Sequence, residues 1–143
     1  MAQQEIKIDW LEKMAFRTEV NGHEIILDAT PEVGGEDRGP RPKPLAMVAL
    51  AGCTGMDVVS ILKKMRVEPE AFSVRVVGEL TEEHPKTYTG MHVIYEFRGN
   101  DLPMDKLEKA VRLSEERYCG ISATYRKAMG ITSEIRILEN WNL

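Results

Sequence analysis

The stretch LAMVALAGCTGMDVVSILKKM, residues 45–65, is a long apolar segment that predicts the central element of the fold. We expect one helix that starts at Pro44, because proline suits the first helical turn, and ends near Arg66, where basic residues favour the carboxyl end. A helix that is apolar around most of its circumference is normally covered on all sides by a sheet or by another subunit. Asp57 and several small polar residues interrupt the segment, so a membrane crossing is not expected.

Short strands are expected before this helix. Residues 4–9, 14–20 and 23–28 predict a small antiparallel sheet, and Asn21-Gly22 is a strong signal for a two-residue hairpin. Residues 30–44 are rich in glycine and proline and are expected to form a mobile loop without regular structure.

Strands and helices are expected after the central helix. Residues 71–80 and 87–98 predict a second antiparallel pair, and apolar residues alternate along its second strand at Met91, Val93, Tyr95 and Phe97. The remaining chain predicts helices at 103–118 and 120–129, Gly130 as the carboxyl-end cap of the latter, and a last strand at 131–140.

The order of these elements indicates an α+β fold in which antiparallel sheets surround a long buried central helix. We expect residues 1–143 to form a single domain, because no segment is long enough to act as a linker between two domains. One small sheet cannot cover such a helix on every side. A homodimer with paired central helices is therefore expected, since a second copy supplies the missing layer.

Composition and charge limit the classes of function. The formal net charge of −4 lacks the basic excess of a nucleic-acid or anionic-membrane surface, so neither partner is expected. The two cysteines are far apart and form no CxxC or His/Cys metal spacing, which argues against a disulfide scaffold or a zinc site. We expect a reducing cytoplasm, no cofactor and no metal. A metal site built from Cys53, Asp57 and a distant histidine remains a minor alternative.

Cys53 is the first candidate for a functional residue. Gly52 and Gly55 flank it, and glycine in a helix interior costs about 1 kcal/mol relative to alanine. Some other interaction or function is therefore expected to offset this cost. The two glycines indicate either close packing over small side chains or a path by which substrate reaches the sulfur. Asp57 lies one turn away on the same face, where its charge would raise the thiol pKa. A reactive Cys53 therefore needs a cation, for which the candidates are Arg17, Arg38, Arg41 and Lys43.

Cys119 is the second candidate. In the sequence RYCGIS it lies at the expected start of a helix, where the helix dipole favours a thiolate, although it is equally typical of a residue packed between two helices. We expect an apolar pocket near the cysteines lined by Met47, Leu50 and Met56, side chains that are also typical of a plain core.

The segments PLAMVALAGCTGMDVVSILKKM and LSEERYCGISATYRKAMGI resemble the OsmC and organic hydroperoxide resistance (Ohr) family, most closely its YhfA-like branch. The resemblance implies intertwined α+β homodimers with two central helices and active sites at the subunit interface. It also implies a thiol peroxidase of oxidative stress defence, in which Cys53 attacks a hydroperoxide and becomes a sulfenic acid, Cys119 condenses with it to a disulfide, and a dithiol reductant reopens that bond.

The sequence departs from the pattern of the family peroxidases at two points. Those proteins carry a glutamate before the first cysteine, where this chain has RPKPL at residues 41–45, so Glu36 and Asp37 are the candidates to replace it. They also use an arginine from the amino-terminal strands to hold the thiolate, and Arg17 is the residue in the corresponding region, although it lacks the glycine-rich context usual in the family.

Other functions remain open from the sequence. The main alternative is a non-catalytic dimeric module that binds a small apolar or thiol-bearing ligand, and a third is a purely structural role for both sulfurs. A hydrolase is not expected, because His23, His84 and His92 lie in predicted strands or turns without a motif partner.

Overall fold

The computed structural model describes residues 2–138, and the chain divides between Ala46 and Met47 into two compact units. The expectation of one domain stays a prediction.

The first unit is built on a small antiparallel sheet in the order β1-β2-β3, formed by β1 (Ile8–Glu12), β2 (Ala15–Val20) and β3 (His23–Leu27). The predicted hairpin is confirmed, because Val20 pairs with His23 and the two turn residues both have positive φ angles, 52° for Asn21 and 81° for Gly22. The first strand was expected at residues 4–9 and lies further along the chain. All five of its residues are exposed, so no buried face fixes its position in the sequence pattern.

The loop that leaves this sheet is organised by Asp28. Contrary to the expectation of no regular structure, it contains one 3₁₀ turn, η1 (Pro31–Val33). The Asp28 carboxylate is 4% exposed and accepts hydrogen bonds from the backbone N–H groups of Ala29, Glu36 and Arg38. Burial favours the protonated acid, but the three N–H donors outweigh it and lower the pKa of Asp28.

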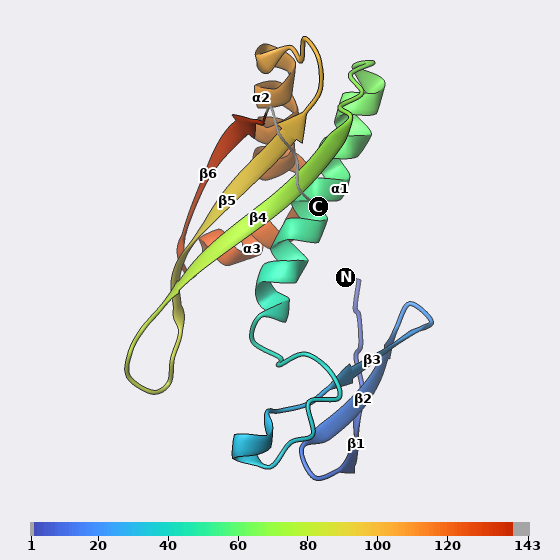
Figure 1. Ribbon diagram of the computed structural model, residues 1–143, viewed down its shortest axis with the longest axis vertical. Coiled ribbons are helices and arrows are strands. Elements are labelled where there is room, and N and C mark those ends of the chain that lie inside the picture. Colours follow the sequence, from blue (N-terminus) through green and yellow to red (C-terminus); the bar gives the residue numbers. More distant parts are fainter. Residues whose placement is uncertain (1, 139–143) are drawn as a thin grey trace. The chain divides into compact units, whose positions relative to one another are not determined.

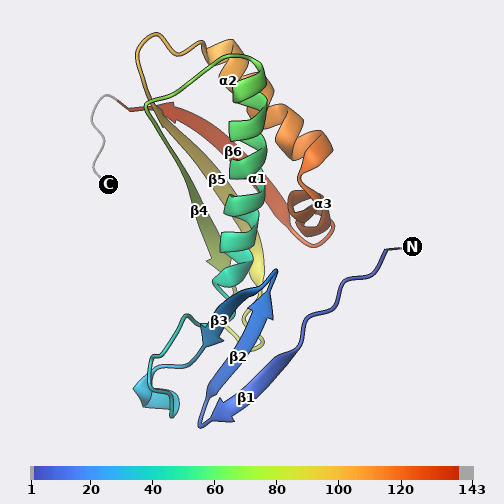
Figure 2. The same cartoon turned by 90° about the vertical axis from the view of Figure 1, so that its right-hand side faces the viewer.

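The second unit combines three helices with a three-stranded sheet. The long helix α1 (Leu45–Lys64) leads into β4 (Ala71–Leu80) and β5 (Tyr88–Arg98), which pair antiparallel. The chain then forms α2 (Met104–Leu113), the π-helical turn η2 (Ser114–Tyr118), α3 (Gly120–Arg126) and β6 (Gly130–Ile137). Strand β6 pairs parallel to β5, so the helical segment between them is the crossover, and the helices lie on one face of the sheet (Figures 1 and 2).

The core of this unit lies between the sheet and the helices. The predicted alternation along β5 is confirmed, because Met91, Val93, Tyr95 and Phe97 are all at most 2% exposed. Helix α2 contributes Leu107, Ala110 and Val111, and α1 contributes a single stripe at every fourth position, which consists of Leu50, Thr54, Val58 and Leu62.

The rest of α1 is not covered within one chain. Val48, Met56 and Val59 are 61%, 77% and 54% exposed, so the expected cover on all sides is not provided by the chain's own sheet and helices. Among the described residues, α1 is the one helix whose length and mean hydropathy of 1.9 meet the requirements for crossing a bilayer, a test that central helices of soluble proteins also pass.

Three predicted boundaries in the carboxyl-terminal half are wrong. The helix expected over 103–118 changes at Ser114 into a π-helical turn, and the next helix ends at Arg126 and not at 129. Gly130 begins β6 and does not cap a helix. The last strand was expected to reach residue 140, and Glu139 and Asn140 lie outside the described residues.

Candidate functional site

The two cysteines meet although 65 residues separate them in the chain. The sulfurs of Cys53 and Cys119 and a carboxylate oxygen of Asp57 all lie within 4.8 Å of one another, and both cysteines are free thiols. The expectation that Asp57 shares a helix face with Cys53 is confirmed by this distance. The cluster brings two potential nucleophiles and one acid into a single small volume.

The π-helical turn positions Cys119. The Cys119 N–H donates to the Ser114 carbonyl at 2.8 Å, a bond that spans five residues, and Cys119 then adopts an extended backbone with φ −80° and ψ 102°. This break starts α3, where the Cys119 sulfur accepts a 3.3 Å hydrogen bond from the Ser122 N–H. Cys119 is 2% exposed, whereas Cys53 is only partly buried.

Asp57 is held in place from the same turn. The hydroxyl of Ser114, which is fully buried, donates a 3.0 Å hydrogen bond to Asp57 Oδ2. Ser114 is not among the site residues predicted from the sequence. The one available signal was the acid itself, because a carboxylate in an apolar helix needs a partner.

Within this unit the surroundings of Cys53 favour the neutral thiol. Burial raises the pKa of Cys53, and the side chain of Cys119 and the charge of Asp57 raise it further. The backbone N–H of Ile121 acts in the opposite direction, because it hydrogen-bonds to the sulfur and stabilises the thiolate. The net direction is upward, so these groups by themselves do not activate Cys53.

A second partly buried carboxylate, that of Glu115, lies near Cys119. Glu115 accepts hydrogen bonds from the Tyr95 hydroxyl at 2.9 Å and from the Ser133 hydroxyl at 3.2 Å. Its carbonyl accepts a 2.6 Å hydrogen bond from Arg126, which also pairs with its carboxylate at 3.7 Å. Burial raises the pKa of Tyr95 well above its ordinary value, so Tyr95 stays a protonated donor. This network joins β5, η2, α3 and β6 near Cys119, and the sequence pattern does not predict it.

The four cations proposed from the sequence lie in the first unit, where Arg17, Arg38 and Arg41 pair with acids. Arg17 donates a 2.7 Å hydrogen bond to Glu24, which raises the pKa of Arg17. The remaining pairs of the predicted residues are Arg38 with Glu12, Arg41 with Asp37, and Glu36 with Lys13. Their predicted roles toward the thiol stay predictions.

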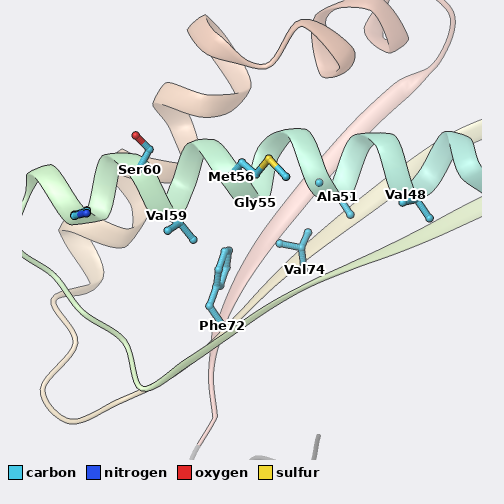
Figure 3. Close-up of a pocket in the computed structure, with 10 residues that line it drawn as sticks. Val48, Ala51, Gly55, Met56, Val59, Ser60, Phe72 and Val74 are labelled. Carbon is cyan, nitrogen blue, oxygen red and sulfur yellow. The ribbon is translucent and has the colours of Figure 1, made fainter. Parts of the chain in front are cut away.

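An apolar hollow of about 730 Å³ runs along the exposed side of α1 and the neighbouring strand β4 (Figure 3). Its lining includes Val48, Met56 and Val59 from α1 and Phe72 and Val74 from β4. Of the three residues predicted to line a pocket, Met56 lines this hollow and Leu50 belongs to the buried stripe of α1. The side chain of Met47 lies beside Gly78 of β4, where an added Cβ atom would be 3.1 Å from the Met47 sulfur.

The two glycines beside Cys53 have different surroundings. A Cβ atom added at Gly55 would approach Val74 Cγ2 to 3.3 Å, whereas one added at Gly52 would meet nothing within 4 Å. Gly55 is therefore explained by close packing of α1 on β4. Both glycines line the hollow, but Cys53 is not among its lining residues.

His92 has partners that the sequence did not indicate. Its ring nitrogens lie 2.7 Å from the Thr132 hydroxyl and 2.8 Å from a Glu134 oxygen, in a row across β5 and β6. Glu134 also accepts two 3.1 Å hydrogen bonds from Arg136, and its side chain is 40% exposed. The row is a partly exposed charge network on the sheet.

The fold and the cysteine pair together define a class of small α+β proteins that hold two thiols between a long central helix and a short helix. Residues 34–134 match the family described as OsmC-like protein, and the chain belongs to this family. The resemblance seen in the sequence is thereby confirmed.

Individual relatives agree with this assignment. The chain is 32% identical over 133 residues to protein YhfA of Escherichia coli K12, which covers 92% of this chain and 96% of YhfA. A hypothetical protein of Aquifex aeolicus VF5 superposes with a TM-score of 0.83 at 28% identity over 99% of this chain and 100% of the other. An organic hydroperoxide resistance protein OsmC of Legionella pneumophila superposes with a TM-score of 0.64 at 17% identity, over 95% of this chain and 99% of its own, and shares the fold.

Proposed function

We propose that this protein reduces organic hydroperoxides in oxidative stress defence, with Cys53 as the attacking thiol and Cys119 as the resolving thiol. The observation that carries the proposal is the placement of both sulfurs within 4.8 Å of one another on two different elements. Membership of the OsmC-like family supports it, as does the fold shared with the Legionella organic hydroperoxide resistance protein.

The proposed chemistry has three steps. The Cys53 thiolate attacks one peroxide oxygen, so that an S–O bond forms, the O–O bond breaks, and the leaving alkoxide takes a proton to become an alcohol. Cys119 then attacks the sulfenic sulfur, the S–S bond forms and water leaves. A dithiol reductant of the proposed cytoplasmic compartment finally reduces the disulfide by thiol exchange. A disulfide requires the two sulfurs to approach to about 2.05 Å, so the sulfurs must move together from their separation of up to 4.8 Å.

The first step requires a thiolate, and the groups around Cys53 raise its pKa. A cation must therefore act on the sulfur. We propose Arg17 for this role, an arginine of the first unit whose guanidinium pairs with Glu24 at 2.7 Å. The proposal for Arg17 rests on the family pattern and on the fact that an arginine side chain keeps its positive charge across the accessible pH range.

The experiment that tests the proposal is an intact-mass measurement of the reduced protein after brief exposure to one equivalent of an organic hydroperoxide, with a chelator present. The expected product is a disulfide between Cys53 and Cys119, which lowers the mass by two hydrogens. In Cys119→Ser we expect the reaction to stop at a sulfenic acid on Cys53 that dimedone traps, and in Cys53→Ser we expect no peroxide consumption. Peroxide turnover by Cys53→Ser would reject the proposal.

Arg17→Ala tests the assigned cation. We expect it to slow peroxide reduction and to raise the pH at which Cys53 becomes reactive, with partial rescue in Arg17→Lys. Arg98→Ala, the same change at an arginine paired with Glu70 at the end of β5, is the matched control and should have no effect. Equal rates for Arg17→Ala and Arg98→Ala would remove Arg17 from the mechanism.

We further propose that a second copy of the chain covers the exposed apolar side of α1. Three apolar side chains on this side, Val48, Met56 and Val59, are more than half exposed, and the hollow beside them has walls from α1 and β4. A homodimer with paired α1 helices would remove this apolar surface from water, as is normal for a helix with apolar residues on all sides.

The same hollow favours a second candidate function, a non-catalytic module that binds a small apolar or thiol-bearing ligand. Its volume of about 730 Å³ lies within the usual range for small-molecule sites. This candidate predicts that both thiols survive the peroxide experiment and that native mass spectrometry finds a ligand retained by the purified protein.

A further inference from the structure

Two thiols and one carboxylate form a set of three potential anionic ligands. The Cys53 and Cys119 sulfurs and an Asp57 oxygen lie within 4.8 Å of one another. A tetrahedral zinc ion has Zn–S bonds of about 2.3 Å and Zn–O bonds of about 2.1 Å, which hold such donors roughly 3.6 to 3.8 Å apart. Side-chain movements of about 1 Å would therefore bring all three donors to bonding distance of a single cation.

We propose that Cys53, Asp57 and Cys119 bind a thiophilic divalent cation of the zinc class, with the fourth position taken by water or an outside ligand. Two sulfurs select a soft or borderline metal over magnesium or calcium, which prefer sets of oxygen ligands. The sequence predicted no metal, and its minor alternative required a distant histidine. The structure supplies Cys119 in place of that histidine.

Each of the three ligands has a neighbour that orients it. The Ser114 hydroxyl donates to Asp57 Oδ2 at 3.0 Å, and the Ser122 N–H donates to the Cys119 sulfur at 3.3 Å. The Ile121 N–H hydrogen-bonds to the Cys53 sulfur. Protein metal sites depend on such outer contacts, because they fix the direction of each donor before the cation arrives.

The charge balance also favours a cation. As ligands, Cys53 and Cys119 bind as thiolates, so two protons pass to the solvent when the cation enters. The site then holds three negative charges in a partly buried volume, and their mutual repulsion is relieved by a divalent cation. Cys53 and Asp57 are only partly buried, so solvent reaches these two ligands, whereas Cys119 forms the buried end of the site.

The test is a titration of the fully reduced, full-length protein with Zn²⁺ against a chromogenic chelator, in a buffer without dithiols. We expect one equivalent per chain, and with Co²⁺ we expect the thiolate-to-cobalt charge-transfer bands of a tetrahedral sulfur site. Binding should be lost in Cys53→Ser and in Cys119→Ser. Ser114→Ala, which leaves every ligand in place, should weaken it by about 10- to 100-fold. Asp57→Asn should also weaken it, and the control Asp101→Asn should bind as the wild type does.

Two results would overturn this inference. One is the absence of Zn²⁺ binding by the reduced wild type. The other is binding that survives both cysteine substitutions and disappears in His92→Ala, which would place the cation on the charge network of β5 and β6. Peroxide-driven disulfide formation without Zn²⁺ binding would reject the metal site and leave the proposed function standing. Zn²⁺ binding without peroxide reduction would reject the proposed peroxidase function and leave the metal site standing.

Discussion

The hydroxyl of Ser114, on the π-helical turn η2, donates a 3.0 Å hydrogen bond to the carboxylate of Asp57 on α1. The bond joins two elements whose residues are 57 positions apart in the chain. It holds the carboxylate beside both sulfurs and attaches the turn that precedes Cys119 to the helix that carries Cys53. The geometry of the cluster therefore depends on this contact.

The first prediction measures that contact. Ser114→Ala should lower the free energy of unfolding by about 1 to 3 kcal/mol, because a hydrogen bond to a charged group is lost at a fully buried position. Urea titration at a fixed protein concentration gives the midpoint and slope of unfolding, and from them the free energy of unfolding. A double-mutant cycle with Asp57→Ala separates the pair from its surroundings. Additive losses, with no coupling between Ser114 and Asp57, would show that the contact does not stabilise the fold.

The second prediction compares the two glycines beside Cys53. Gly52→Ala should stabilise the chain by about 0.5 to 1 kcal/mol, because it removes the entropic cost of a helical glycine and its Cβ meets nothing within 4 Å. Gly55→Ala should gain less or lose stability, because its Cβ lies 3.3 Å from Val74. Each variant is the matched control of the other. The free energy of unfolding is measured for both by urea titration at low protein concentration, where a second copy of the chain contributes least to stability. The opposite order would contradict the packing described for α1.

The extent to which the sequence predicted the fold depended on whether an element has a buried face. In β5 the alternating side chains meet the core, and the predicted pattern is correct at all four positions from Met91 to Phe97. In β1 every residue is exposed, so the alternation that should locate a strand is absent and the predicted range is early by several residues. Glycine is favoured just after a helix and is also found at the first residue of a strand, so local sequence predicts a cap at Gly130 where the chain begins β6.

The site was predicted only in part, because its contacts are long-range. Helical spacing paired Asp57 with Cys53, local signals identified Cys119 separately, and the family resemblance paired the two cysteines. The contacts of Ser114 with Asp57, and of Tyr95 with Glu115, depend on how η2 packs against α1 and β5. A helical pattern continues through residue 118 in the sequence, so the π-helical turn that creates these contacts left no local signal.

The third prediction concerns the pH dependence of the Cys53 thiol. Burial, the Cys119 side chain and the Asp57 charge all raise the pKa of Cys53. Asp57→Asn removes a negative charge next to the sulfur, so it should lower this pKa and speed alkylation of Cys53 by iodoacetamide at neutral pH. Mass spectrometry of the Cys53 peptide over a pH series gives the midpoint for each variant.

The control for this measurement is Asp101→Asn, the same change at an aspartate between β5 and α2. It should leave the alkylation midpoint of Cys53 unchanged. A midpoint that stays the same or rises in Asp57→Asn would mean that the Asp57 charge does not act on the sulfur.

The fourth prediction concerns the exposed side of α1. Met56→Asp should convert the proposed homodimer into single chains, because Met56 is 77% exposed in one chain and would be buried in the pair. Burying a methionine is worth about 1.5 to 3 kcal/mol, and a two-fold interface uses it twice, so the dissociation constant should rise by roughly 100-fold or more. Sedimentation velocity over a range of protein concentrations measures the change. Met104→Asp, at the start of α2 where the side chain is 39% exposed, is the matched control and should stay dimeric. A wild type that sediments as a single chain at every concentration would show that α1 keeps its apolar side uncovered, and the hollow beside it would then be left to a small ligand.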